Sequence, residues 1–177
     1  MLLTRRNLPY TALLIGAIYL VLAPKEKQID VFLTGYSYWD NTPRASAAIA
    51  RPVVHTQAAG TGTFDDPVTL AVGHAIYFNH SFMDFPTGTR FYFPRLRKYA
   101  IVEDLCGDGR TPQNGPCHIG YKGHAWLDIY VDGSEAGNQI ANACMADITG
   151  IQPAIVNPKA KYRVVAGPIT EGGCQVF

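Results

Sequence analysis

The chain has 177 residues, 47% of them hydrophobic and 16% charged, which is the composition of one globular domain and excludes a disordered chain. Its 15 basic and 14 acidic residues give a formal net charge of +1, so there is no excess of positive charge to attract nucleic acid. The 17 glycines and 12 prolines are scattered along the sequence, which favours many short turns and a strand-rich fold.

The first 23 residues have the pattern of a secretory signal peptide. Arg5 and Arg6 precede an apolar segment that ends at Ala23, and this segment has the length of about 7–15 residues that is typical of such leaders. It is shorter than the roughly 20 residues that span a bilayer. We expect residues 1–23 to be a cleaved leader, with an uncleaved membrane anchor as the alternative because Pro24 follows Ala23. Both interpretations place the rest of the chain outside the cytosol, so we expect a secreted, extracellular protein.

A single domain is expected over residues 28–177, built mainly from strands. Six short apolar runs between turn residues predict strands: 31–39, 68–73, 89–94, 98–104, 126–133 and 162–169. The stretch from 135 to 150 predicts a helix. The residues expected on its buried face are Ile140, Ala143, Cys144 and Ile148. Six strands and one short helix favour a small closed barrel.

The connection from Ala45 to Asp66 is long and rich in small residues. Loops of this length are usually functional or act as lids. The alternative is a plain surface loop with one buried edge, formed by Pro52, Val53 and Val54.

The chain has four cysteines, and an oxidising compartment favours disulfides over metal thiolates. Three pairings are possible among Cys106, Cys117, Cys144 and Cys174. We favour Cys106–Cys117, which closes a turn-rich loop, and Cys144–Cys174, which ties the last residues to the body. A zinc site is disfavoured because the chain has no CxxC pair.

The sequon Asn79-His80-Ser81 predicts a glycosylation acceptor on an exposed loop. The five histidines show no metal-ligand spacing, and we expect neither a metal nor a cofactor.

Two motifs in the second half of the domain point to a known family. The segment PTGTRFYFPRLRKYAIVEDLCGDG, residues 86–109, followed by WLDIYVDG, residues 126–133, resembles the double-psi β-barrel superfamily. That group includes expansins, barwin-like proteins, family 45 endoglucanases, rare lipoprotein A and some lytic transglycosylases. The resemblance covers roughly residues 31–133 and implies a mainly β, six-stranded double-psi β-barrel with one or two short helices. It specifies the fold better than the activity, because the group includes hydrolases, transglycosylases, inhibitors and proteins without known catalysis.

A third motif, TGYSYWDN at residues 34–41, is similar to the opening run of the family 45 endoglucanases, whose aspartate is the catalytic base. By that resemblance Asp40 is the base, Asp128 is the acid, and Asp104 is a neighbouring charge that tunes the acid. The chain departs from those enzymes in having far fewer cysteines and Trp126-Leu127 where they have His-Phe.

Each candidate aspartate also has a structural interpretation. General acid catalysis needs a carboxyl with a raised pKa, which burial or a second carboxylate can supply. We expect the strand ends that carry Asp104 and Asp128 to abut and one of the two pKa values to be raised. Alternatively, Asp128 hydrogen-bonds the Cys106–Cys117 loop, and Asp40 caps the turn before Pro43.

Four aromatic side chains and one more aspartate are candidate substrate contacts. Tyr36, Tyr38, Trp39 and Trp126 could line a groove and stack on sugar rings, although aromatic residues with a period of two in a strand are more often core. Asp66 could contact the substrate or only form a turn before Pro67.

These motifs predict a secreted protein that acts on or binds cell-wall polysaccharide or oligosaccharide. The catalytic version is acid-assisted cleavage of a β-glycan, as in a glycoside hydrolase or a lytic transglycosylase. The alternative is a non-catalytic expansin-like or barwin-like module that binds carbohydrate or inhibits a protease. We expect a monomer that binds no nucleic acid and meets a membrane only if residues 1–23 remain uncleaved.

Overall fold

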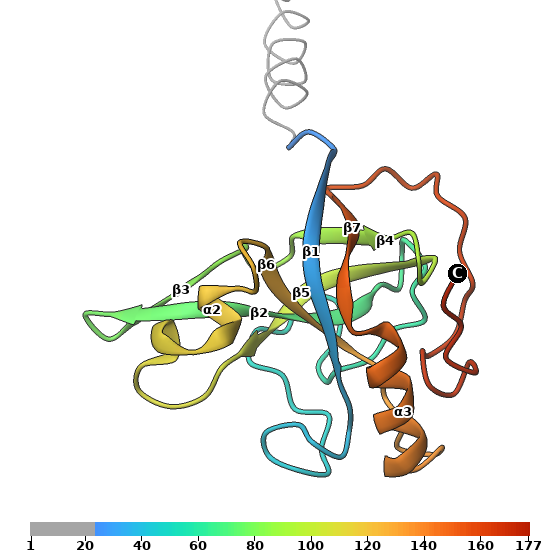
Figure 1. Ribbon diagram of the computed structural model, residues 1–177, viewed down its shortest axis with the longest axis horizontal. Helices are drawn as coiled ribbons and strands as arrows, with labels where there is room; N and C mark the ends of the chain where they lie inside the picture. The colour runs from blue at the N-terminus through green and yellow to red at the C-terminus, as the bar shows by residue number, and fades with distance from the viewer. Residues whose placement is uncertain (1–23) are drawn as a thin grey trace, which may run out of the picture.

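The computed structural model describes residues 24–177, so the predicted leader lies outside the described residues. The elements in chain order are β1 Lys27–Tyr36, β2 Val68–Tyr77, β3 His80–Met83, β4 Arg90–Phe93, β5 Lys98–Cys106, the 3₁₀ turn η1 Pro112–Asn114, α2 Pro116–Ile119, β6 Ala125–Tyr130, α3 Asn138–Ile148 and β7 Gly150–Val156 (Figure 1). In this part of the chain, no helix has both the length and the apolar character needed to cross a bilayer.

The fold is mainly β, as expected. The strands pair in the order β3-β2-β5-β4-β7-β1-β6, and β6 also pairs with β2, so six strands form a closed ring with β3 outside it. The pairs β1–β6 and β2–β5 are parallel, and the other pairs are antiparallel. The core lies inside the ring. There Leu70 of β2 lies opposite both Val102 of β5 and Ile129 of β6, and all three side chains are fully buried. Ring closure leaves β3 as the strand with an unpaired edge in residues 24–177.

Five of the six predicted strands are present, but the one predicted at residues 162–169 is absent. That segment is irregular and is held instead by side chains, because Tyr92 Oη donates to the Arg163 carbonyl and Lys98 Nζ donates to the Val165 carbonyl. The sixth strand of the ring is β7, whose sequence GIQPAIV contains Pro153 opposite Asp30 of β1. A proline removes a ladder donor and usually argues against a strand, so the sequence does not reveal β7.

The predicted helix is present as α3, but the prediction of its buried face was partly wrong. Ala141, Cys144 and Ile148 are buried, whereas Ile140 and Ala143 are exposed. The helix packs against Gly35 of β1. A Cβ added to this glycine would lie 2.8 Å from Ile148 Cδ1, so a side chain there would push α3 away.

Both predicted disulfides, Cys106–Cys117 and Cys144–Cys174, are formed. They indicate an oxidising, extracellular or secretory environment. The first joins the end of β5 to α2, and the second joins α3 to the segment that follows β7.

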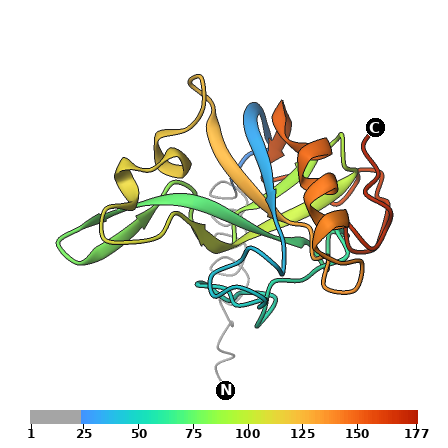
Figure 2. The same ribbon diagram turned by 60° about the horizontal axis from the view of Figure 1, so that its bottom comes forward.

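The loop from Ala45 to Asp66 is irregular and lies at one end of the ring (Figure 2). The buried edge of the alternative interpretation is absent, because Pro52, Val53 and Val54 are exposed. The loop contributes Ala58 to the core instead, and its backbone is fixed by Glu103 of β5, as described below.

Candidate functional site

The end of strand β5 carries a β-bulge that determines where Asp104 points. Leu70 of β2 lies opposite Val102, but the next residue, Ala71, lies opposite Asp104, so Glu103 is the extra residue of β5. In a regular strand Asp104 would share the core face of Val102, because residues two apart face the same side. The bulge places Asp104 on the opposite face, together with Ala71.

Asp128 reaches the same face from the other side of β2. Ala71 lies opposite Asp104 of β5 and opposite Asp128 of β6, so the two aspartates flank one small residue. We expected the two strand ends to abut, and this was wrong, because β2 lies between them. Two strand spacings separate their Cα atoms by about 10 Å. Because Ala71 has only a methyl group, the space above it stays open.

A cavity of about 450 Å³ opens at this place. Four aspartates line it, Asp40, Asp104, Asp108 and Asp128, and no lysine or arginine is among its lining residues. Tyr36 and His74 contribute further polar groups to the wall. The structure therefore brings the three predicted catalytic aspartates together in one acidic cavity.

Asp128 has the environment of a proton donor. Its pKa is raised to about 7, mainly by burial and to a smaller extent by the Asp40 and Asp104 charges, against the lowering effect of a hydrogen bond from Thr34. We had expected the second carboxylate to be the main reason for the raised pKa, but burial is the largest cause. The alternative contact to the disulfide loop is weak, because Asp128 Oδ2 lies 4.0 Å from the Cys106 sulfur, which has no hydrogen to donate.

A short hydrogen-bond relay orients the Asp128 carboxyl. Trp126 Nε1 donates to Thr34 Oγ1 at 2.7 Å, and Thr34 Oγ1 lies 2.7 Å from Asp128 Oδ1. Because the indole N–H can only donate, it occupies a lone pair of the hydroxyl and leaves the hydroxyl hydrogen for Asp128. Oδ1 is thus an acceptor, and the acidic proton belongs on Oδ2.

Asp104 is held more firmly than Asp128. Its Oδ1 accepts from the Ala50 and Leu105 backbone N–H groups, and its Oδ2 accepts from the Tyr36 hydroxyl at 3.0 Å. Burial raises the pKa of Asp104, while these three hydrogen bonds lower it. Asp104 is therefore suited to shaping the field of the cavity rather than to moving toward a ligand.

Asp40 caps the turn, as in its structural interpretation, and also reaches the cavity. Its Oδ1 accepts from the Ser37 backbone N–H and hydroxyl, each at 2.7 Å, which is the turn-capping role. The residue is exposed and also lines the cavity.

The aromatic candidates do not form the expected groove. Tyr36 lines the cavity, but Tyr38, Trp39 and Trp126 are not among its lining residues. Trp39 donates its indole N–H to the Gly133 carbonyl, and Tyr38 packs edge-on against Trp39. Trp126 acts on the site through Thr34.

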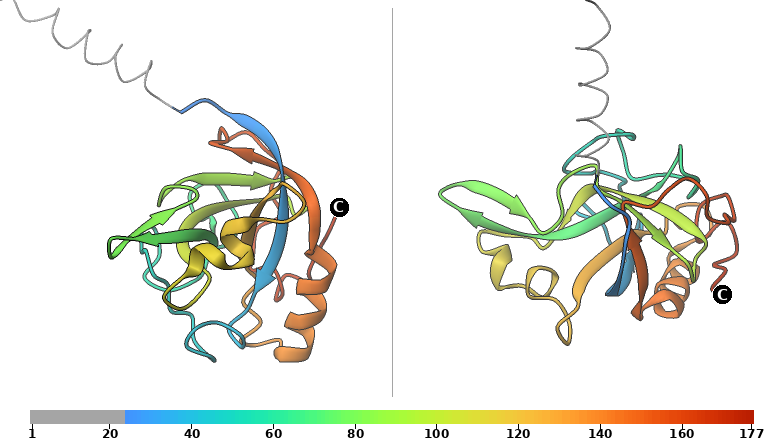
Figure 3. Two further views of the ribbon diagram at one scale, coloured as in Figure 1. Left: turned by 60° about the vertical axis from the view of Figure 1, so that its left-hand side comes forward. Right: turned by 90° about the horizontal axis from the view of Figure 1, so that it is seen from above.

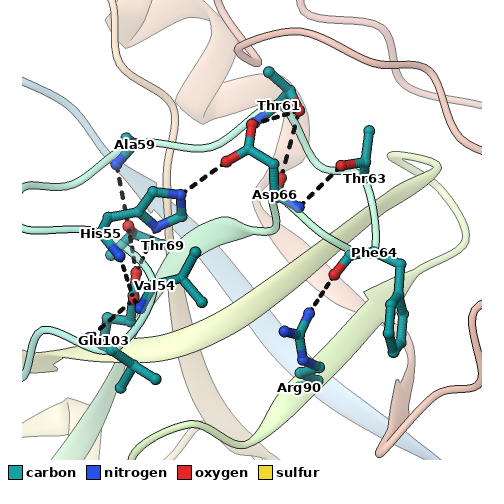
Figure 4. A network of polar contacts seen from close by, with 11 residues as sticks. Val54, His55, Ala59, Thr61, Thr63, Phe64, Asp66, Thr69, Arg90 and Glu103 are labelled. Carbon is teal, nitrogen blue, oxygen red and sulfur yellow. Dashed lines mark hydrogen bonds and ion pairs between the residues drawn. The ribbon is translucent and has the colours of Figure 1, made fainter.

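Asp66 lies in a separate network that the sequence did not reveal (Figure 4). His55 Nε2 lies 2.9 Å from Asp66 Oδ1, and His55 Nδ1 lies 2.8 Å from Glu103 Oε2. The fully buried Glu103 also accepts from the backbone N–H groups of Val53, Val54 and His55. No spacing in the sequence links His55 to Glu103, so only the fold could show this contact.

The network places one positive charge between two negative charges. Burial opposes ionisation of all three groups, but the hydrogen bonds and charges dominate, so the pKa of His55 is raised and those of Glu103 and Asp66 are lowered. An imidazolium between two carboxylates therefore fixes the loop to β5. This contact is structural, and Asp66 has no part in the cavity.

Within residues 24–177, no three His, Cys, Asp or Glu side chains form a group that could hold a metal ion. The cavity carboxylates are engaged with hydroxyl and backbone donors, as described above.

Comparison with known proteins identifies the family. A family described as the DDB_G0273701 N-terminal domain matches residues 28–175. The chain belongs to this family. It is 27% identical over 154 residues to the "Uncharacterized protein DDB_G0273701/DDB_G0273221" of Dictyostelium discoideum, an alignment that covers 86% of this chain and 61% of that protein. The chain thus spans less than two thirds of the length of this relative. No solved structure matches it.

Proposed function

We propose that the chain is a secreted double-psi β-barrel protein. The proposal is supported by the ring of six paired strands, by the parallel pairs β1–β6 and β2–β5 within it, and by the segment from 86 to 109 that resembles that superfamily. The two disulfides support passage through an oxidising compartment.

We propose further that it cleaves a β-glycan of a cell wall by acid catalysis. The observation that carries this proposal is the convergence of Asp40, Asp104 and Asp128 in one cavity, with the pKa of Asp128 raised to about 7. Below its pKa of about 7, Asp128 is mostly protonated and donates the proton of Oδ2 to the glycosidic oxygen as the bond to the anomeric carbon breaks. Asp40, which is exposed at the wall of the cavity, accepts a proton from the attacking water. Asp104 and Tyr36 remain bound to each other as a fixed wall.

Asp128→Asn tests this mechanism, because an amide cannot donate the required proton. We expect turnover of soluble β-glucan or chitin oligosaccharides to fall at least about 100-fold, since general acid catalysis contributes about 10²–10⁴-fold. Wild-type kcat should also fall as the pH rises above about 7, where Asp128 loses its proton. Asp147→Asn, on the exposed face of α3, is the matched control and should keep full activity. Unchanged turnover in Asp128→Asn would contradict the assignment.

A non-catalytic carbohydrate-binding role is the second candidate. It is favoured by the turn-capping hydrogen bonds of Asp40, because Oδ1 of the proposed base already accepts from two Ser37 donors. In that case the wild-type protein is retained on insoluble wall material without releasing reducing ends. Tyr36→Ala, which removes an aromatic wall of the cavity, should then weaken retention more than Asp128→Asn.

A further inference from the structure

The β2–β3 hairpin extends away from the rest of the fold, beside α2 (Figures 1 and 3). Tyr77 pairs with His80, so Phe78 and Asn79 form a two-residue turn. Both have positive φ angles, 51° and 63°, as in the type I′ turns that suit tight hairpins. Asn tolerates this conformation well, but a bulky aromatic residue such as Phe78 rarely adopts it.

The hairpin tip exposes an unusual amount of aromatic surface. Phe78 is 95% exposed, and Tyr77 and Phe82 are each more than half exposed. The Tyr77 and Phe82 rings lie on one face with centroids 6.3 Å apart. Apolar side chains gathered in this way mark a surface that something covers.

The strand β3 beside this tip also has an unpaired edge. β3 pairs with β2 on one side, and within residues 24–177 no strand pairs with its other side. A free edge next to exposed aromatic side chains promotes edge-to-edge association between copies. The segment from Ala75 to Met83 contains no lysine, arginine, aspartate or glutamate that would prevent such pairing.

We propose that Asn79 carries an N-linked glycan whose first N-acetylglucosamine packs on the aromatic tip of this hairpin. Asn79 is exposed, begins the sequon Asn79-His80-Ser81 and directly follows Phe78. A sugar attached there is held at high effective concentration beside the ring. The apolar C–H face of the sugar covers the ring, while its hydroxyl groups stay in water.

The attachment needs a lipid-linked diphosphate oligosaccharide as the donor, which the secretory pathway of a eukaryotic cell supplies. A bond forms between Asn79 Nδ2 and the anomeric carbon of N-acetylglucosamine. The bond from that carbon to the donor phosphate breaks, and the lipid diphosphate leaves with the electron pair while the amide loses one proton. No redox step is involved.

This occupant accounts for both unusual features of the hairpin. The glycan covers Phe78, and its bulk at the start of β3 keeps a second chain from the free edge. The position is also accessible to the transferring enzyme, because Asn79 lies in the turn between β2 and β3 and this hairpin projects from the body (Figure 3).

Mass spectrometry of the full chain secreted from a eukaryotic host tests the attachment. We expect a glycan mass that peptide N-glycosidase removes, with conversion of Asn79 to aspartate. Asn79→Gln should lack this mass, and Ser81→Thr, which keeps the sequon and the hydroxyl, should retain it. Secreted wild-type protein without a glycan would overturn the proposal.

NMR of the glycosylated protein tests the packing. Ring currents should shift the protons of the first N-acetylglucosamine upfield, and Phe78→Ser should return them to the values of a free glycan. Ile119→Ser, which removes an exposed apolar side chain from α2, is the control and should leave the shifts unchanged. Unshifted protons in the wild-type glycoprotein would overturn the packing, even where Asn79 is fully occupied.

Discussion

At the scale of single residues, Asp128 combines an advantage for chemistry with a cost for stability. The burial that raises its pKa to about 7 means that the folded protein opposes ionisation of this carboxyl. An unfolded chain has no such preference, and its aspartates ionise near pH 3.8. Asp128 thus stabilises the fold most while it is protonated, and the stabilisation is lost as the pH rises through its folded pKa.

We therefore expect wild-type stability to fall relative to Asp128→Asn between about pH 4 and pH 7 and then to level off. The amide carries no charge at either pH, so the variant should gain up to about 4 kcal/mol in its free energy of unfolding at pH 8 over wild type. At pH 4 the two proteins should differ little. Urea unfolding at the two pH values measures this. A difference between the proteins that is the same at both pH values would show that Asp128 ionises in the fold as easily as in water.

The sequence predicted these aspartates better than it predicted their arrangement. Strand patterns placed Asp104 near the end of one strand and Asp128 within another, and the resemblance to family 45 endoglucanases gave Asp40 and Asp128 their proposed roles. The face that Asp104 occupies depends on the bulge at Glu103, which nothing in the local sequence indicates. The separation of the two carboxylates depends on which strand lies between them, and that is a property of the whole topology.

At the scale of elements, Glu103 joins the loop from Ala45 to Asp66 to the strand ring. It accepts hydrogen bonds from three consecutive backbone N–H groups of the loop, beginning at Val53, and from Thr69 of β2, and it pairs with His55. The pKa of Glu103 is lowered and that of His55 is raised. The contact therefore weakens as the pH falls through the pKa of Glu103, or as it rises through the pKa of His55. The loop is thus fixed most firmly between them.

Glu103→Gln should loosen this loop without changing the shape of the side chain. The amide removes one of the two carboxylates that flank the His55 imidazolium, and breaking a buried ion pair typically costs about 3–5 kcal/mol. Because Asp66 still pairs with His55, we expect a loss at the lower end of this range, about 3 kcal/mol in unfolding free energy. The Ala58 N–H, which donates to the Ala47 carbonyl within the loop, should exchange faster with solvent. Asp65→Asn, an exposed acid of the same loop, serves as the control. Unchanged exchange at Ala58 in Glu103→Gln would contradict the anchoring role.

The elements that the sequence missed were missed for physical reasons. The stretch 162–169 has the β-branched residues of a strand, yet no strand of the ring offers it a free edge, because β4 already pairs with β5 and β7. β7 takes that place although it contains Pro153, since its pairing with β1 and β4 outweighs local preference. The buried face of α3 was predicted partly wrongly, because the apolar residues of this helix fit more than one face. Only packing against the rest of the fold decides which face is buried.

At the scale of the whole molecule, the two disulfides stabilise different parts. Cys144–Cys174 closes a separation of 30 residues and attaches the segment after β7 to α3, far along the chain from the cavity. Cys106–Cys117 closes a separation of 11 residues, and Cys106 itself lines the cavity. Longer closed loops restrict the unfolded chain more. The Cys144–Cys174 bond therefore acts mainly on global stability, and the Cys106–Cys117 bond acts on the site as well.

Removing each bond by a pair of alanine substitutions should separate these roles. Cys144→Ala with Cys174→Ala should lower the free energy of unfolding by about 4 kcal/mol, and Cys106→Ala with Cys117→Ala by about 3 kcal/mol, from the entropy of the loops that each bond closes. The second pair should also lower the pKa of Asp128, because loss of the bond between β5 and α2 admits water beside Oδ2. The first pair should leave that pKa unchanged. Carboxyl ¹³C titration of Asp128 in both variants, below their unfolding temperatures, measures the difference. An equal pKa in both variants would show that the Cys106–Cys117 bond supports the fold without shaping the cavity.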